Sequence, residues 1–239
     1  MNILESFSDF LWPRCCRLCG RPSDRDGRHL CSACLERLPF ITQFGCCRIC
    51  GRAGDPAGGE YLCGDCLDQP RYFDRAASAL DYAGLGSELL TEFKFRGGLY
   101  LRADLVDFLE AAAEARVALD KVDLVVPVPL ALPRRLNRGY NQSAVLAKEF
   151  ARRRKLKYAE VLSRRWLSPK QSSLDEAARR ENVRNLFRVR RPAAVAARSV
   201  LVIDDVMTTG ATLDEIARLL KGAGARHVLA VTLCRTLRD

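Results

Sequence analysis

Four C-x-x-C pairs near the start of the chain constrain its fold more than any other feature of the sequence. Ten of the eleven cysteines lie within residues 15–66, and CCRLCGR at 15–21 recurs as CCRICGR at 46–52. Two residues between cysteines let a tight turn aim two thiolates at one point, and two such turns can supply a tetrahedral zinc site. The spacing therefore predicts two closed, structural zinc sites. The predicted ligands are Cys16, Cys19, Cys31, Cys34, Cys47, Cys50, Cys63 and Cys66.

The sequence alone leaves the grouping of these thiolates open. Sequential pairing of neighbouring motifs is simpler, but a cross-braced arrangement is compatible with the same spacing. Cys15 and Cys46 each precede a predicted ligand, and they are either spare or ligands after a shift of one residue. A disulfide framework is the competing interpretation, and it suits a secreted chain. The N-terminus lacks a basic start and a small-residue cleavage site, so we expect a cytoplasmic, zinc-binding protein instead.

Charge is spread unevenly along the chain, whose formal net charge is +10. Residues 1–70 hold 8 basic and 9 acidic side chains, whereas residues 134–198 hold 19 basic and 5 acidic ones. A local excess of this size favours a polyanionic partner or a phosphate-rich ligand, and the alternative is an arginine-rich solvated surface. No segment reaches eighteen consecutive apolar residues, so we expect no transmembrane segment.

The sequence pattern changes at DQPRYFDRA, residues 68–76, which we interpret as the junction between two domains, 1–70 and 71–239. The first domain begins with apolar residues at helical spacing, which predict a short helix that packs on the protein or touches a membrane surface. In the second, strands alternate with helices, which predicts an α/β domain with a parallel sheet. We expect strands at 76–83, 122–129, 157–164, 200–203 and 227–234, and helices at 87–95, 102–115, 143–154 (with Asn141 as N-cap), 174–182 and 211–224.

The segment VLVIDDVMTTGAT, residues 200–212, carries the chemistry of this domain. Asp204 and Asp205 are expected where the apolar strand ends, and 208–210 form the turn into the next helix. A helix N-terminus offers unpaired N–H groups and partial positive charge, which favour a phosphate. Two carboxylates would repel that phosphate, so they fit a neutral part of the ligand, such as sugar hydroxyls, or a bound Mg²⁺. The segment therefore predicts a site for a sugar phosphate.

The same segment closely resembles the phosphoribosyl pyrophosphate (PRPP) signature of type I phosphoribosyltransferases. The resemblance implies that Asp204 and Asp205 are the catalytic pair and contact the ribose 2′- and 3′-hydroxyls. It also implies Mg²⁺ on the pyrophosphate of PRPP, and displacement of that pyrophosphate from C1 through an oxocarbenium-like transition state. The residues that would hold the 5′-phosphate are Thr208, Thr209, Gly210, Ala211 and Thr212.

Nearly the whole chain resembles the ComF family. The motifs are the double zinc ribbon, EFKFRG at 92–97, VPVPL at 126–130, RRLNRGYNQS at 134–143, QSSL at 171–174 and RRENVRNLF at 179–187. The resemblance implies an α/β, parallel-sheet type I phosphoribosyltransferase domain after a small N-terminal double zinc-ribbon domain. It also implies that residues 164–187 are the flexible loop covering the site. Candidates for binding the pyrophosphate or a nucleic-acid phosphate are Lys94, Arg134, Arg135 and Arg138.

ComF-like proteins are associated with natural transformation, so the resemblance implies PRPP, single-stranded DNA and other DNA-uptake proteins as partners. One hypothesis is a DNA-handling protein that keeps the PRPP site as a ligand sensor or a partial enzyme. The other is a PRPP-dependent phosphoribosyltransferase of nucleotide salvage or metabolism with no role on DNA. Tyr140 and Trp166 are candidates for stacking on bases. No base-specific hood is recognisable, so the acceptor is unassigned.

Overall fold

A five-stranded parallel sheet forms the centre of the computed structural model, which describes residues 14–54, 58–165 and 186–237. The strand order is β1-β7-β6-β2-β3, and each neighbouring pair is parallel. A separate antiparallel pair joins β4 to β5. The strands are β1 (Arg75–Asp81), β2 (Leu124–Pro127), β3 (Lys157–Tyr158), β4 (Leu162–Arg164), β5 (Phe187–Val189), β6 (Ser199–Met207) and β7 (His227–Arg235).

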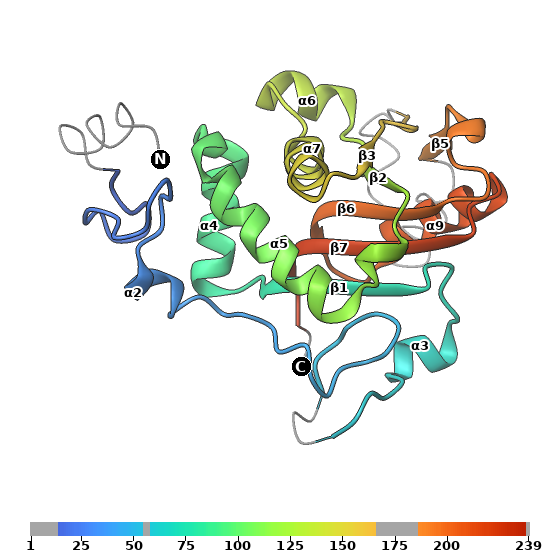
Figure 1. The fold of residues 1–239 in the computed structure, drawn as a ribbon, viewed down its shortest axis with the longest axis horizontal. Coiled ribbons are helices and arrows are strands. Elements are labelled where there is room, and N and C mark those ends of the chain that lie inside the picture. The colour runs from blue at the N-terminus through green and yellow to red at the C-terminus, as the bar shows by residue number, and fades with distance from the viewer. Residues whose placement is uncertain (1–13, 55–57, 166–185, 238–239) are drawn as a thin grey trace.

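Helices cover both faces of the sheet (Figure 1). The long ones are α4 (Gly84–Phe95), α5 (Arg102–Arg116), α7 (Gln142–Arg154) and α9 (Ala211–Gly222). The short ones are α2 (Ser32–Leu35), α3 (Gly64–Asp68) and α6 (Leu132–Arg138), with 3₁₀ turns η1 (Gly98–Leu101), η2 (Leu119–Lys121) and η4 (Pro192–Ala194).

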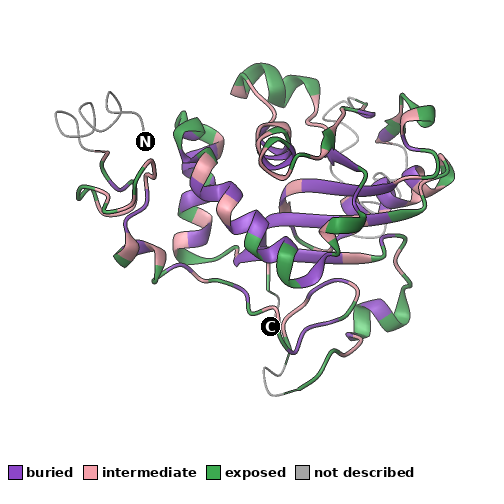
Figure 2. Cartoon of the chain, in the orientation of Figure 1, coloured by how far each residue is buried: buried purple, intermediate pink, exposed green. Residues whose placement is uncertain are grey.

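The apolar run of β6 explains why it lies inside the sheet. Side chains alternate between the faces of a strand, so a strand buried on both faces must be apolar throughout. Leu201 and Ile203 pack in the core that contains α4, α5 and α7. Val200 and Val202 pack in the core that contains α9. Figure 2 shows this burial along the central strands.

The two cysteine groups join these two cores separately. Cys16, Cys31 and Cys34 belong to the core with α4 and α5. The second group, Cys47, Cys50, Cys63 and Cys66, packs with Phe73 and α9 in the other core. The zinc-ribbon segment is therefore packed against both faces of the larger fold.

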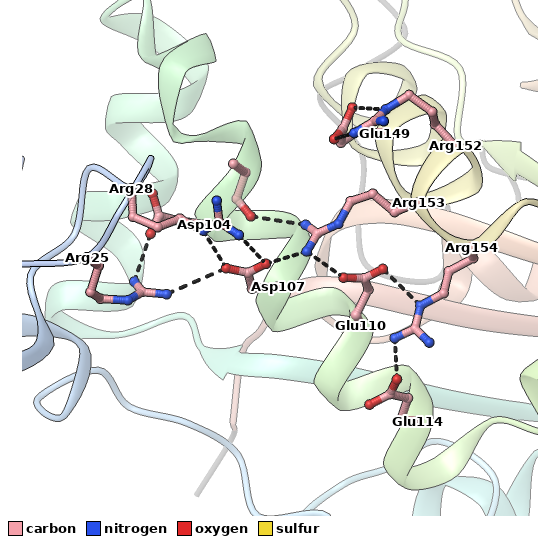
Figure 3. Close-up of polar contacts among 11 residues, drawn as sticks. Arg25, Arg28, Asp104, Asp107, Glu110, Glu114, Glu149, Arg152, Arg153 and Arg154 are labelled. Carbon is pink, nitrogen blue, oxygen red and sulfur yellow. Dashed lines mark hydrogen bonds and ion pairs between the residues drawn. The ribbon is translucent and has the colours of Figure 1, made fainter. Parts of the chain in front are cut away.

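An ion-pair ladder fixes the first ribbon and α7 to α5 (Figure 3). Arg25 pairs with Asp104 at 2.9 Å, and Arg28 pairs with Asp107 at 2.8 Å. From α7, Arg153 reaches Asp107 at 2.6 Å. Further pairs of the ladder join Arg153 and Arg154 to Glu110, Arg154 to Glu114, and Arg152 to Glu149. These arginines of the basic block are thus neutralised within the protein, and the block is not one continuous surface for a polyanion.

Most predicted elements are confirmed, and two predictions are corrected. The strand expected at 157–164 is wrong, because the chain leaves the main sheet after β3. Ala159 N–H still donates to Val125 C=O, but Val161 C=O already accepts from Arg190 N–H beside β5. The strand expected at 200–203 extends to Met207, because β7 pairs with it as far as Arg235.

Several predictions lie outside the described residues: the N-terminal helix, the helix at 174–182, and most of the loop at 164–187, together with Trp166. The domain boundary after residue 70 stays a prediction. Within the described ranges, no helix is long and apolar enough to cross a membrane.

Candidate functional site

The acidic pair lies inside β6 and beyond the end of its neighbour β2. The expectation that Asp204 and Asp205 follow the strand is therefore wrong in detail. β2 stops pairing at Pro127, opposite Ile203, whereas the pairing of β6 with β7 continues through Asp204. One side of β6 is open at this point, which is the carboxyl edge of the sheet where ligands of parallel α/β folds bind.

The N-terminus of α7 contacts both carboxylates. Asn141 caps this helix as predicted, because its side chain accepts from Ser143 N–H at 3.1 Å. Ser143 Oγ donates to Asp204 Oδ1 at 2.9 Å, and the Gln142 amide donates to Asp205. The motif at 134–143 thus positions the acid pair as well as supplying cations.

Lys94, a predicted phosphate ligand, lies on the acid pair. Its Nζ is 3.2 Å from Asp205 Oδ2, and both side chains are largely buried. A buried carboxylate needs a cation or hydrogen-bond donors to remain ionised. Lys94 therefore compensates Asp205, and it can also reach a ligand placed in the adjoining cavity.

Burial and the neighbouring charge of Asp205 raise the pKa of Asp204 to about 7. The Asp205 N–H, the Ser143 hydroxyl and the Lys94 ammonium act in the opposite direction, but they do not outweigh burial. Asp204 therefore holds a proton more readily than an exposed aspartate does. It can accept a hydrogen bond from a ribose hydroxyl as an anion and donate one as an acid.

We expect the carboxyl carbon of Asp204 to titrate by NMR with an apparent pKa near 7 in the ligand-free protein. Replacing Lys94 by Met should raise that pKa further, because the substitution removes a nearby positive charge. An Asp204 pKa near 4 in the wild type would contradict the burial and the charge coupling described here.

The turn between β6 and α9 has the geometry of an anion-binding loop. Gly210 is the N-cap of α9, and its φ of +80° lies in the left-handed region. The Thr209 hydroxyl accepts from Ala211 N–H at 3.3 Å. Because the first N–H groups of a helix have no intrahelical acceptor, the turn offers donors to a phosphate, as the motif predicts.

Replacing Gly210 by Ala is expected to destabilise the protein by about 1–2 kcal/mol, because a non-glycine residue is strained at this φ. The added Cβ would also lie 2.7 Å from the Met207 Cε atom. Gly222→Ala is the matched control, since that position has no positive φ and no atom within 4 Å of the added Cβ. Denaturant unfolding should show a loss of stability for Gly210→Ala and none for Gly222→Ala. Equal unfolding midpoints for the two variants would contradict the assigned loop geometry.

A cavity of about 150 Å³ lies between the acid pair and a cluster of cations. Three of the four predicted cations line it, namely Lys94, Arg134 and Arg138, and so does Thr212 of the loop. The predicted residues that do not line it are Arg135, Thr208, Thr209, Gly210 and Ala211. The cavity joins the carboxylates to Thr212 at the start of α9.

The sequence analysis missed Arg164, which also lines this cavity from the end of β4. Burial lowers its pKa, and the charge of Arg134 adds to that effect, while Asp204 opposes it. Three residues lining the cavity have a buried polar atom without a hydrogen-bond partner in the described part of the chain: Arg138 Nη1, Arg164 Nε and Gln142 Oε1. The two arginine atoms are buried donors, which fit an anionic ligand between the arginines, whereas Gln142 Oε1 is an acceptor.

The eight predicted zinc ligands gather into two sets of four in sequential pairing. They are Cys16, Cys19, Cys31 and Cys34, and Cys47, Cys50, Cys63 and Cys66, with ligand atoms within 4.8 Å of one another. The Cys19–Cys31 and Cys50–Cys63 sulfurs are 3.7 and 3.6 Å apart. Zinc at a Zn–S distance of 2.3 Å requires about 3.8 Å between sulfurs, whereas a disulfide requires about 2 Å. The geometry fits zinc, and Cys15 and Cys46 belong to neither set.

Two buried arginines border the second set. Arg235 donates to Cys50 Sγ at 3.5 Å, and Arg116 donates to Cys47 C=O at 2.8 Å and to Cys46 Sγ at 3.0 Å. In the described residues neither guanidinium has a carboxylate partner. A zinc ion with four thiolates has a net charge of −2, so the metal-bound set supplies the negative charge that these buried cations need.

Comparisons with known proteins agree with this geometry. Residues 7–67 match the family profile described as a double zinc ribbon domain, and residues 140–239 match that of the phosphoribosyl transferase domain. The DNA utilization protein YhgH of Escherichia coli (strain K12) is 34% identical over 230 residues, covering 94% of this chain and 98% of that protein. Competence protein F of Haemophilus influenzae is 31% identical, covering 72% and 78%. The chain belongs to the ComF family.

Further comparisons show weaker similarity. Competence protein ComFC of Streptococcus pneumoniae is 29% identical and covers 62% of each chain. Among solved structures, an adenine phosphoribosyltransferase aligns at 17% identity with a TM-score of 0.40, covering 59% of this chain and 73% of that one. The two family matches, the sheet topology and the two cysteine sets show that this ComF-family protein has a parallel-sheet phosphoribosyltransferase domain and an N-terminal double zinc ribbon.

Proposed function

We propose that this ComF-family protein binds PRPP with Mg²⁺ at the carboxyl edge of β6 and acts in the cytoplasm on single-stranded DNA during DNA uptake. The observation that carries the first half is the placement of two carboxylates beside an anion-binding turn and four cations. Asp204 and Asp205 take the ribose hydroxyls, and residues 208–212 take the 5′-phosphate. The neutral ribose hydroxyls then face carboxylates, and the negatively charged phosphate faces N–H donors.

The pyrophosphate is assigned to the cation cluster. Arg134, Arg138 and Arg164 line the cavity, and the buried, unpartnered donors of Arg138 and Arg164 suit a multiply charged anion. Mg²⁺ bound with PRPP would supply further neutralisation of the pyrophosphate oxygens. Within the protein, the same cations would stabilise the charge that develops as pyrophosphate leaves C1.

Support for a role on DNA comes from relatives and from charge. YhgH is named for DNA utilization, and competence protein F for competence. The net charge of +10 favours association with a polyanion. Arg134, Arg135 and Arg138 of α6 are not ion-paired within the described residues, unlike Arg152–Arg154, so they offer cations to a strand. Other DNA-uptake proteins remain proposed partners.

The alternative function is that of a phosphoribosyltransferase of nucleotide metabolism without a role on DNA. The acid pair and the turn support this alternative as much as they support the role on DNA, because any enzyme that uses PRPP needs a PRPP site. Release of pyrophosphate from PRPP against a panel of free bases and single-stranded DNA separates the two. We expect release to depend on DNA, and release with one free base and none with DNA would favour the alternative. No release under any condition would leave PRPP as a bound effector.

A further inference from the structure

A larger cavity adjoins the acid-pair site on the side of α4 and α6. Its volume is about 750 Å³, and it shares Lys94, Arg134 and Arg138 with the smaller cavity. Its remaining lining comes from the end of α4, from α6 and from residues beside them, and contains no carboxylate. The two cavities therefore lie next to each other, and the acid pair lines only the smaller one.

Two of the three cations that line the larger cavity, Arg134 and Arg138, have no ion-pair partner in the described residues. Lys94 alone among the three is ion-paired, to Asp205. Arg138 lies with its Cζ 4.6 Å from the centre of the Phe95 ring, and its Nη1 is buried without a hydrogen-bond partner in the described residues. A guanidinium held against a ring and still lacking an acceptor is well placed to bind a phosphate.

Aromatic side chains flank these cations. Phe95 is 66% exposed and Tyr82 is 39% exposed, and both line the cavity. Large exposed aromatic groups gain little from packing within the protein, whereas a base stacked on one contributes substantially to nucleic-acid binding. Tyr140, which the sequence suggested as a stacking residue, packs on Phe93 and donates to the Phe93 backbone C=O. Tyr140 is therefore less free than Phe95 or Tyr82 to stack on a base.

The chemistry of the cavity matches a nucleotide with phosphates on both sides. Stacking surfaces beside arginines are the usual combination in single-strand binding sites, and they do not require a particular base sequence. Every residue of α6 is at least partly exposed, so the cavity is open along this helix and a chain can enter and leave it. An enclosed pocket for a free base would instead need buried groups that match the polar edge of that base.

We propose that this cavity binds one nucleotide of single-stranded DNA, with its base on Phe95 and Tyr82 and its flanking phosphates on Arg134 and Arg138. The inference rests on the proposed function, and it adds the position of the strand. The strand would lie directly beside the PRPP site and share three cations with it. The two polyanions should therefore weaken the binding of each other, by the same factor in both directions.

The test is fluorescence anisotropy of a labelled oligo(dT) with the zinc-loaded full chain at low salt. We expect Phe95→Leu to weaken binding by about 5-fold or more. Arg138→Gln should weaken it similarly and reduce the salt slope by about 1. Phe44→Leu and Arg152→Gln are matched controls, since Phe44 is 79% exposed in the ribbon and Arg152 pairs with Glu149. Both should bind like the wild type, and saturating PRPP should weaken oligo(dT) binding.

Each outcome distinguishes the position of the strand from the proposed function. If the wild type binds oligo(dT) but the Phe95 and Arg138 variants bind equally well, the cavity assignment is wrong and DNA binding stands. Equal losses in the control variants would also overturn it, because they would indicate general electrostatic attraction. If the wild type fails to bind oligo(dT), the DNA part of the proposed function fails too.

Discussion

Substituting Cys50 by Ser is expected to lower zinc content from two ions per chain to one and to destabilise the whole fold. Structural zinc sites contribute about 10 kcal/mol or more to folding, since their ligands are not preorganised in the unfolded chain. In this protein the loss would also leave Arg116 and Arg235 buried without their negative partner. We therefore expect the melting temperature to fall by about 10 °C or more.

The effect should extend to the phosphate-binding turn. Arg235, which contacts Cys50 Sγ, also lies 3.9 Å from Met207 Sδ, and Thr236 N–H donates to Met207 C=O. The Met207 side chain in turn packs directly against Gly210. Loss of the second zinc ion should thus disorder the turn and weaken PRPP binding.

Cys15→Ser is the control for this experiment, because Cys15 belongs to neither set of four. Elemental analysis, a melting curve and a PRPP titration should be recorded for both variants. The account would be contradicted if Cys50→Ser retained two zinc ions, or if it lost one ion and kept the wild-type melting temperature.

Replacing Asp204 and Asp205 together by Asn is expected to weaken PRPP binding by at least about 100-fold. A hydrogen bond to a charged group contributes about 1.5–3 kcal/mol, and the variant weakens two of them. Two effects on the stability of the ligand-free protein oppose each other. The substitution removes two carboxylates that repel each other, but it leaves the largely buried Lys94 without its partner Asp205.

Asp120→Asn makes the same kind of charge change on exposed η2 and should bind PRPP like the wild type. Calorimetry gives the affinities, and a melting curve checks that the double variant is folded. Unchanged affinity in the folded double variant would assign PRPP to another place on the protein.

Local sequence was sufficient for the parts of the site that lie close together in the chain. Asn141 was recognisable as an N-cap because the donor it accepts from, Ser143 N–H, is two residues away. The acid pair and the turn at 208–210 lie on one short segment, so their order along the chain already places them at a strand-to-helix junction. The eight cysteine ligands were recognisable from their spacing, but their grouping into sequential sets comes from the structure.

The parts that sequence did not predict depend on contacts between distant segments. Arg164 reaches the cavity because the chain leaves the main sheet after β3 and pairs with β5 instead. Helix α6 has seven residues, too few to show a periodic pattern. Arg116 and Arg235 appear ordinary in the sequence, and only their burial beside the second cysteine set shows that they compensate its charge.

The most direct test of the central claim is a calorimetric titration of the zinc-loaded wild-type protein with PRPP, with and without Mg²⁺. Ribose 5-phosphate and pyrophosphate should be titrated in parallel, because each would occupy one end of the site. The account predicts micromolar binding of PRPP with Mg²⁺ and weaker binding of either fragment. Absence of heat with PRPP at several temperatures, in protein shown to contain two zinc ions, would contradict it.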